Sequence, residues 1–302
     1  SPILIEGLSK LEYRGYDSAG IAIHDGININ SLKAKGKLEN LIRLLEEHPL
    51  EGCMGIGHTR WATHGAPSDI NAHPHISGDH VIGVVHNGII ENYMLIKEEL
   101  IQKGYQFITE TDTETIAHLT DDYYKQGMSF EDAVFNAVQR LEGTYALGII
   151  CKDEPGKLIA VRKGAPLVIG RGIGENFFAS DIPAILHHTR DVYFLEDNEI
   201  AVITENSVKI YDKQRNIVER DIYHVTWDIE AAEKNGFAHF MLKEIHEQPR
   251  IVKDTIMSRI PEKSDEVKLD DIQLGKEELN HIDRIYIVAC GTAYYAGLVG
   301  KY

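Results

Sequence analysis

The stretch TYALGIICKDEPGKLIAVRKG (144–164) opens a series of short apolar runs that decides the fold class. The series continues with PLVIGRG (166–172), NFFASD (176–181), VYFLEDN (192–198), EIAVIT (199–204), SVKIYD (207–212) and IVERDI (217–222). Each run has the length of a strand, and turn-forming residues separate the runs, which is the pattern of antiparallel strands joined by turns. Residues 144–222 therefore predict an extensive antiparallel β-structure.

Upstream of these strands the periodicity is helical. Apolar residues recur at three- and four-residue spacing in ENYMLIKEELIQKG (91–104), DTETIAHLTDDYYKQG (112–127) and SFEDAVFNAVQRLEG (129–143). Ser129, with two acidic residues close behind it, marks the start of a helix. A further helix is expected at IPAILHHTR (182–190).

The N-terminal part again predicts strands. GIAIHD (20–25) and ININSLKAK (27–35) form a hairpin around Asp25-Gly26, and HVIGVVHNGII (80–90) is a buried strand that runs into an Asn-Gly turn. Another strand begins MGIGHTRWATHG (54–65), and helices are expected at 1–11 and 37–48. Strands, then helices, then strands favour an α+β fold, a four-layer sandwich of two antiparallel sheets between helical layers.

The character of the chain changes near Val225, where a polar, helix-forming stretch interrupted by Pro249 begins. IDRIYIVACGTAYYAGLVGKY (282–302) then reads as a buried strand, a Gly-containing turn and the start of a helix. That order opens a doubly wound α/β unit, in which the helix N-terminus can hold a phosphate. We expect a first domain at 1–228, a linker with helices at 229–283 and the start of a second domain at 284–302.

Composition limits the classes of partner. Asp and Glu number 47 against 31 Lys and Arg, a formal charge of −16, whereas a nucleic-acid surface needs clustered cations. The longest apolar runs are strand-length, so the sequence predicts no bilayer-spanning segment. Cys53, Cys151 and Cys290 are few and scattered, which favours a reducing cytoplasm over a disulfide framework.

HTRWATHGAPSDINAHPH (58–75) is the most unusual stretch. Arg60 can hold an α-carboxylate through a bidentate pair, and Trp61 can close over a ligand. The alternative is an interior strand followed by a His-rich turn that packs against its neighbours. A third interpretation is a metal site built from the histidines at 58, 64, 73, 75, 80 and 86. The Pro between His73 and His75 and the missing helical spacing of ligands count against it.

Two other short segments carry candidate chemistry. In VVHNGIIEN (84–92), the Asn87 amide and the Gly88 N–H can converge on one oxygen, as a tetrahedral intermediate of acyl transfer requires, although Asn-Gly is usually only a turn. In ETDTETIAHL (110–119), Thr111, Asp112 or Thr113 caps a helix, or Asp112 instead faces an α-ammonium group. Arg14 and Asp17, in LEYRGYDSAG (11–20), form an ion pair in a loop if they have no other role.

Taken in order, these segments resemble the class II glutamine amidotransferases, whose nucleophile is an N-terminal cysteine, and among them the family of glutamine–fructose-6-phosphate aminotransferases. The resemblance rests on LEYRGYDSAGIA, GIGHTRWATHGAPSDINAHPH, HNGIIENY, ETDTE, FFASD, MLKEIHEQP and IVACGTAYYAG, and it covers essentially the whole chain. MLKEIHEQP and the CGTAYYAG loop separate this family from other members of the class. The resemblance implies the fold of the N-terminal-nucleophile hydrolases, followed by the start of an α/β sugar-isomerase domain.

The resemblance also implies roles for residues. Arg60 and Asp112 would hold the carboxylate and ammonium groups of glutamine, and Asn87 with Gly88 would form the oxyanion hole. Trp61 and Thr63 would lie on the loop that closes over glutamine, with His64 and His73 supporting that region. Arg14 would lie near the nucleophile, and Thr292 would belong to a sugar-phosphate cradle. The partners implied are L-glutamine, fructose 6-phosphate and a second copy bound through the isomerase domain, with no cofactor and no metal.

The family's domain begins with Cys-Gly-Ile-Val-Gly, and by this resemblance roughly a dozen residues would precede Ser1. The chain as it stands is therefore expected to lack the nucleophile, to leave a sheet edge unpaired, to bind glutamine weakly or not at all, and not to hydrolyse it. Two further hypotheses remain: a non-catalytic glutamine-binding regulatory fragment, and a metal-dependent amidohydrolase built on the histidines.

Overall fold

The computed structural model describes residues 1–226, 237–257, 275–289 and 291–301. The chain divides into two compact units, Ser1–Asn235 and Gly236–Tyr302. The domain limits expected at 228 and 283 remain predictions. We describe each unit by itself.

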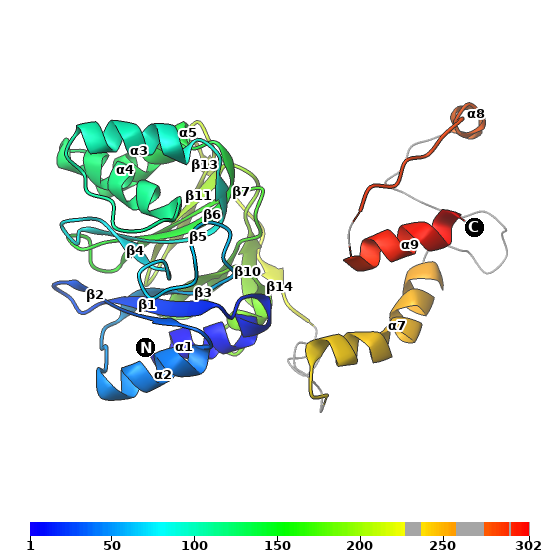
Figure 1. Cartoon of the computed structure of the whole chain (residues 1–302), viewed down its shortest axis with the longest axis horizontal. Helices are drawn as coiled ribbons and strands as arrows, with labels where there is room; N and C mark the ends of the chain where they lie inside the picture. Colours follow the sequence, from blue (N-terminus) through cyan, green and yellow to red (C-terminus); the bar gives the residue numbers. More distant parts are fainter. Residues whose placement is uncertain (227–236, 258–274, 290, 302) are drawn as a thin grey trace. The chain divides into compact units, whose positions relative to one another are not determined.

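The first unit is built around a large antiparallel sheet (Figure 1). Its strands run in the order β13-β12-β11-β7-β6-β5-β4. Their bounds are β4 His75–Ile76, β5 Ile82–Ile90, β6 Gly143–Cys151, β7 Lys157–Lys163, β11 Glu199–Thr204, β12 Val208–Tyr211 and β13 Ile217–Val218. The strands β5, β6 and β11 are the most buried of this sheet.

Two smaller antiparallel sheets pack against one face of the large sheet. The first has the order β2-β1-β3, with β1 Ser18–His24, β2 Ile29–Lys35 and β3 Met54–Arg60. The second has the order β14-β10-β8-β9, with β8 Val168–Arg171, β9 Asn176–Ala179, β10 Asp191–Phe194 and β14 Tyr223–His224. Each small sheet ends on a strand, β3 or β9, that borders the same cavity.

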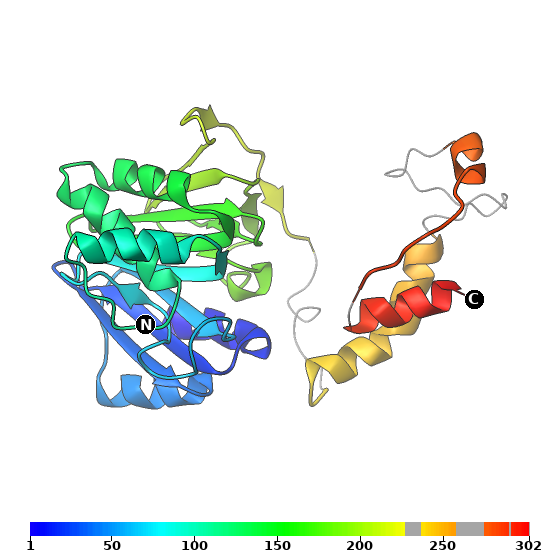
Figure 2. The same ribbon diagram turned by 45° about the horizontal axis from the view of Figure 1, so that its top comes forward.

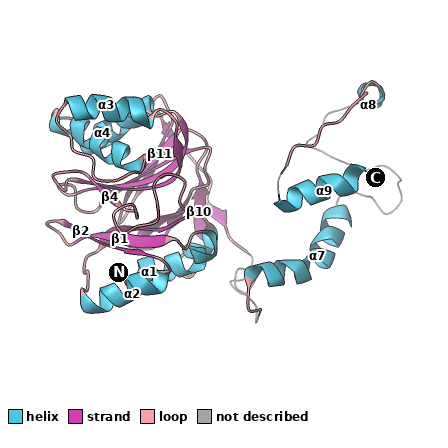
Figure 3. Cartoon of the chain, in the orientation of Figure 1, coloured by secondary structure: helices cyan, strands magenta, loops and turns pink. Residues whose placement is uncertain are grey.

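Helices cover the two outer faces (Figures 2 and 3). The helices α3 Tyr93–Gln102, α4 Thr113–Lys125 and α5 Phe130–Arg140 bury their apolar sides on the large sheet. On the opposite side, α1 Pro2–Leu11 and α2 Leu38–Glu47 pack on β1 and β2. Two 3-10 turns, η1 Glu12–Arg14 and η2 Ile182–Ala184, complete this side. The layers therefore run helix, sheet, sheet, helix, and the predicted α+β sandwich is confirmed.

Local chemistry explains why several of these elements begin where they do. The Ser129 hydroxyl accepts from the Asp132 N–H at 3.1 Å, which satisfies a free donor in the first turn of α5. Asp25 closes the β1–β2 hairpin, because its carboxylate accepts from the N–H groups of Ile27 and Asn28 at 2.8 Å. Both features match the sequence predictions.

Two expectations about local structure in this unit are wrong, and two short strands were not predicted. Asn87-Gly88 is not a turn: it lies inside β5, where the two residues pair with Ala146 and Tyr145 of β6. The helix expected at 182–190 is reduced to η2, because the residues that follow it, Ile185 and Leu186, turn into an apolar cluster with β8 and β10. The short strands β4 and β14 lie outside every predicted run.

The second unit contains α7 Phe240–Met257, α8 Lys276–Asn280 and α9 Gly291–Lys301. The strand expected at the start of 282–302 is not formed over the described residues 282–289, and their apolar side chains, such as Val288, are exposed. A strand needs a neighbouring strand for its backbone hydrogen bonds, and the described part of this unit offers none. Cys290 and the Thr292 side chain lie outside the described residues. Of the helices described, none is long and apolar enough to cross a membrane.

Candidate functional site

A cavity of about 340 Å³ lies in the first unit, where the two small sheets meet the large one. Its walls come from α1, β3, β5, β6 and β9 and from the loop that follows β3. The predicted site residues of this unit all line it: Arg14, Arg60, Trp61, Thr63, His64, His73, Asn87, Gly88 and Asp112. Thr292 belongs to the other unit, so its role stays a prediction.

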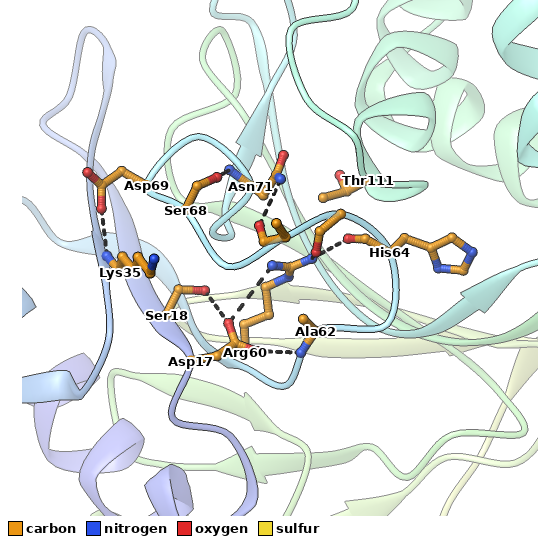
Figure 4. Close-up of polar contacts among 12 residues, drawn as sticks. Asp17, Ser18, Lys35, Arg60, Ala62, His64, Ser68, Asp69, Asn71 and Thr111 are labelled. Carbon is orange, nitrogen blue, oxygen red and sulfur yellow. Dashed lines mark hydrogen bonds and ion pairs between the residues drawn. The ribbon is translucent and has the colours of Figure 1, made fainter.

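Arg60 ends β3 and is almost fully buried, with 3% of the residue exposed. Its Nη2 donates to the carbonyl of His64 and, at 3.2 Å, to that of Gly65 (Figure 4). Nη1 lies 3.9 Å from Asp17 Oδ1 and has no hydrogen-bond partner within the described part of the chain. Burial lowers the pKa of Arg60, and the nearby carboxylates of Asp17 and Asp112 oppose that shift. A buried cation with free donors on a cavity wall suits a carboxylate ligand.

Hydrogen bonds at several positions hold the loop after β3 in place. Asp17 accepts from the Ala62 N–H, and the Asn71 amide donates to the Ala66 carbonyl and to Glu110 Oε2, both at 2.9 Å. Lys35 donates its N–H to Asp69, as Figure 4 shows. These contacts fix the loop that begins at Arg60 against the neighbouring hairpin and the segment before α4.

The first residues of this loop are more open. Trp61 is 61% exposed and meets Tyr16 edge to face, with 5.3 Å between ring centroids. Thr63 is also exposed, whereas the His64 ring is half-buried and packs edge to face against Tyr93. Closure of Trp61 and Thr63 over a ligand stays a prediction.

Asp112 lies on the cavity wall just before α4, with its carboxylate buried. It occupies the N-cap position but makes no capping hydrogen bond. Its Oδ2 instead accepts from the N–H of Ile90, the last residue of β5, at 2.8 Å. The helix-capping role considered from the sequence is therefore not the one this side chain performs.

Asn87 and Gly88 face the cavity from β5. The Asn87 side chain is held by His58 of β3, whose Nε2 lies 2.8 Å from Asn87 Oδ1. Gly88 has φ +127°, a backbone conformation that glycine adopts readily and other residues rarely adopt. The two residues thus present an amide and an unusual stretch of backbone to one side of the cavity.

The histidines stack on one another beside this pair. The His58 and His73 rings lie 4.3 Å apart in a near-parallel stack, and His73 meets His75 edge to face at 4.7 Å. Burial lowers the pKa of His58 to about 4 and that of His73 well below its usual range. These rings are therefore neutral at pH 7 and pack against each other. Throughout the described residues, no group of three or more His, Cys, Asp or Glu side chains is arranged to hold a metal ion.

Arg14 lines the cavity from η1, and its Nη1 forms a 2.9 Å ion pair with Asp181, next to η2. The sequence suggested Asp17 as its loop partner, but Asp17 faces Arg60 instead. Neither Cys53 nor Cys151, the two cysteines that the structure describes, lines the cavity.

Several lining residues were not predicted from the sequence as part of the site. Phe177, Phe178 and Ser180 reach it from β9 and the residue after it, and Thr111 and Thr113 flank Asp112. The FFASD run identifies β9 as a strand, but a strand pattern does not tell which cavity its side chains face. His58 was considered only as a metal ligand.

Comparison with known proteins finds relatives of this chain. A family model described as a glutamine amidotransferase domain matches residues 58–187. The glutamine–fructose-6-phosphate aminotransferases of Clostridium perfringens and Thermus thermophilus are 58% and 46% identical, each over 99% of this chain. The chain spans about half the length of these curated relatives, 49% and 48%.

A solved structure, the glutamine phosphoribosylpyrophosphate amidotransferase of B. subtilis in complex with ADP and GMP, has a similar fold. It matches with a TM-score of 0.61 and 27% identity over 72% of this chain and 47% of that one. Residues 58–187 therefore match the glutamine amidotransferase domain family, and the chain as a whole is similar to about half the length of the glutamine–fructose-6-phosphate aminotransferases.

Proposed function

We propose that this cavity binds L-glutamine and that the full-length protein hydrolyses the glutamine side-chain amide there to release ammonia. The observation that carries the proposal is the presence of a buried basic residue, Arg60, and a buried acidic residue, Asp112, on the wall of one cavity. A zwitterionic α-amino acid supplies a complementary charge to each of them. A neutral, polar side chain would then extend toward Asn87 and Gly88.

In this arrangement Arg60 Nη1 donates to the α-carboxylate and Asp112 accepts from the α-ammonium group. The amide carbon is attacked by the cysteine thiol that the family uses as its nucleophile, and the carbonyl oxygen becomes an oxyanion. Donors from Asn87 and Gly88 would stabilise that charge, each worth about 3 kcal/mol in comparable oxyanion holes. The C–N bond then breaks, the nitrogen leaves as ammonia after gaining a proton, and water hydrolyses the acyl-enzyme to glutamate.

For the complete protein we propose the reaction that the names of its relatives describe. In that reaction the ammonia is transferred to fructose 6-phosphate to give glucosamine 6-phosphate. Thr292, at the start of α9, would belong to the sugar-phosphate cradle of an isomerase domain. We further propose a homodimer formed through that domain. Free Cys53 and Cys151 fit a protein of the reducing cytoplasm.

Asp112→Asn in the full-length protein tests the glutamine site. Asn keeps an oxygen that can accept from the Ile90 N–H but removes the charge that would pair with the α-ammonium group. Breaking a buried charge pair costs at least about 2 kcal/mol, so the Kd for glutamine should rise at least about 30-fold. Isothermal titration calorimetry measures that Kd, and glutamate release measures turnover.

The matched control is Asp79→Asn, because Asp79 is an exposed carboxylate paired with Lys125 on the surface. It should leave both the Kd and the turnover unchanged. An Asp112→Asn protein that binds glutamine as tightly as the wild type would contradict the proposed site. Binding by the wild type without glutamate release would favour the non-catalytic glutamine-binding hypothesis.

A further inference from the structure

We propose that His58 is a positioning residue: its hydrogen bond to Asn87 fixes the orientation of that amide, so that the amide nitrogen faces the substrate. The inference rests on the proposed function, because it assigns a task in stabilising the oxyanion. The bond joins Nε2 of His58 to Oδ1 of Asn87 at 2.8 Å. It connects two residues that are 29 positions apart in sequence and lie on β3 and β5, strands of different sheets.

The direction of this bond follows from the chemistry of both groups. Oδ1 of an amide can only accept, so Nε2 of His58 must carry the proton. Burial keeps the imidazole neutral at pH 7, because it lowers the pKa of His58 to about 4. A neutral ring has one N–H, which leaves Nδ1 as an acceptor. Nδ1 is buried without a hydrogen-bond partner in the described part of the chain.

The reversed orientation of the Asn87 amide is less favourable. If the Asn87 amide were turned over, its nitrogen would donate to Nε2 and the proton of His58 would have to reside on Nδ1. That arrangement would bury an N–H group without a partner, which is rarer in proteins than an unpaired acceptor. The surroundings of the His58 ring therefore favour the Asn87 amide orientation in which Oδ1 accepts the hydrogen bond from His58.

The His58 ring is itself held in place. It stacks on His73 with 21° between ring planes, and His73 Nδ1 accepts from the His86 backbone N–H at 3.3 Å. The donor is therefore fixed before any ligand arrives. With Oδ1 occupied, the Asn87 NH₂ group is the end of the amide left for the cavity. A reversed amide would place its carbonyl against the developing oxyanion and repel it.

Glutamine hydrolysis by variants of the full-length protein tests this role. In His58→Asn the shorter side chain places no donor at the Nε2 position, whereas the amide nitrogen of His58→Gln reaches it. Loss of an oxyanion donor costs about 100- to 1,000-fold in kcat, and a donor that is only misoriented should cost about 10- to 100-fold. We expect that loss in His58→Asn, with the KM for glutamine changed less than about threefold, and most of the activity restored in His58→Gln.

Combination with Asn87→Ala separates positioning from a merely structural effect. Once the Asn87 amide is gone, His58→Asn should lower kcat no further, because its effect passes through that amide. His24→Phe is the matched control. His24 is buried and, like His58, makes one Nε2 hydrogen bond, 2.6 Å to the Lys152 carbonyl, but it does not line the cavity. Its loss should lower thermal stability without lowering kcat.

Two results would overturn the inference while leaving the proposed function intact. One is full activity in His58→Asn, and the other is an equal loss of kcat from His58→Asn with and without Asn87. If His58→Asn does not fold, a large loss of kcat in the folded His58→Gln would equally overturn it. Absence of glutamate release from the wild-type protein would instead count against the proposed function.

Discussion

At the scale of single residues, the cavity depends on a backbone conformation at Gly88 that other residues rarely adopt. Its φ is +127°, and a Cβ at this position would lie 2.0 Å from the Thr144 carbonyl oxygen of the neighbouring strand. Both the dihedral angle and the contact with β6 therefore require glycine. The requirement arises from the pairing of β5 with β6 and not from the residues next to Gly88 in sequence.

Gly88→Ala should consequently lower the free energy of unfolding by about 3 kcal/mol or more, the sum of backbone strain and a steric clash. Gly104→Ala is the control, because Gly104 also has a positive φ, +95°, but no atom lies within 4 Å of its added Cβ. That change should cost only about 1 to 2 kcal/mol. Urea denaturation of the two variants measures the difference, and equal costs would show that β6 does not constrain Gly88.

The same residue shows where sequence interpretation stops. The sequence predicts a turn at Asn87-Gly88, because that pair usually forms one. Its position inside β5 depends on a partner strand more than fifty residues later in the sequence, which no local pattern reveals. The resemblance to a known family supplied candidate roles for this pair, but it did not supply the contact with His58.

At the scale of secondary-structure elements, the first turn of α4 anchors the segment that carries Asp112. Glu114 is almost fully buried, and its carboxylate accepts from the N–H groups of Ile108 and Thr109 at 2.9 and 2.8 Å and from the Thr109 hydroxyl at 2.7 Å. Burial alone would raise the pKa of Glu114, but His118 and these hydrogen bonds outweigh it and lower the pKa to about 2.

This shift predicts a pH-dependent contribution to stability. A carboxyl group whose pKa falls from 4.5 to about 2 on folding stabilises the fold fully above pH 4.5, by about 3 kcal/mol, and loses that contribution as the pH falls toward 2. Glu114→Gln should therefore lower the free energy of unfolding at pH 7, and the gap to the wild type should narrow below pH 4.5. Urea titrations at several pH values measure it; a gap that stays constant down to pH 3 would contradict this assignment.

Most of the long elements follow from periodicity and capping. The helices α2 to α5 begin and end close to the predicted limits because each has an apolar face long enough to be recognised. The helix predicted at IPAILHHTR (182–190) does not form. Its apolar residues pack into a neighbouring cluster, and its histidines at 187 and 188 pair with Glu6 of α1. Tertiary contacts of this kind override weak helical periodicity.

At the scale of the whole molecule, the candidate site exists only because three sheets meet. β3, β5 and β9 come from different sheets and lie far apart in sequence, yet their residues form one cavity wall. Sequence patterns predict the strands and the layered architecture, but they do not say which sheet edges face each other. The placement of Phe177 and Phe178 in the cavity could therefore be learned only from the assembled unit.

The most direct test of the account is a crystal structure of the full-length protein with L-glutamine or its product L-glutamate bound. We expect the ligand in the cavity of the first unit, with its α-carboxylate on Arg60, its α-ammonium group on Asp112 and its side-chain carbonyl toward Asn87 and Gly88. A ligand bound elsewhere, or one whose α-carboxylate and side chain are exchanged in the cavity, would contradict the proposed glutamine site.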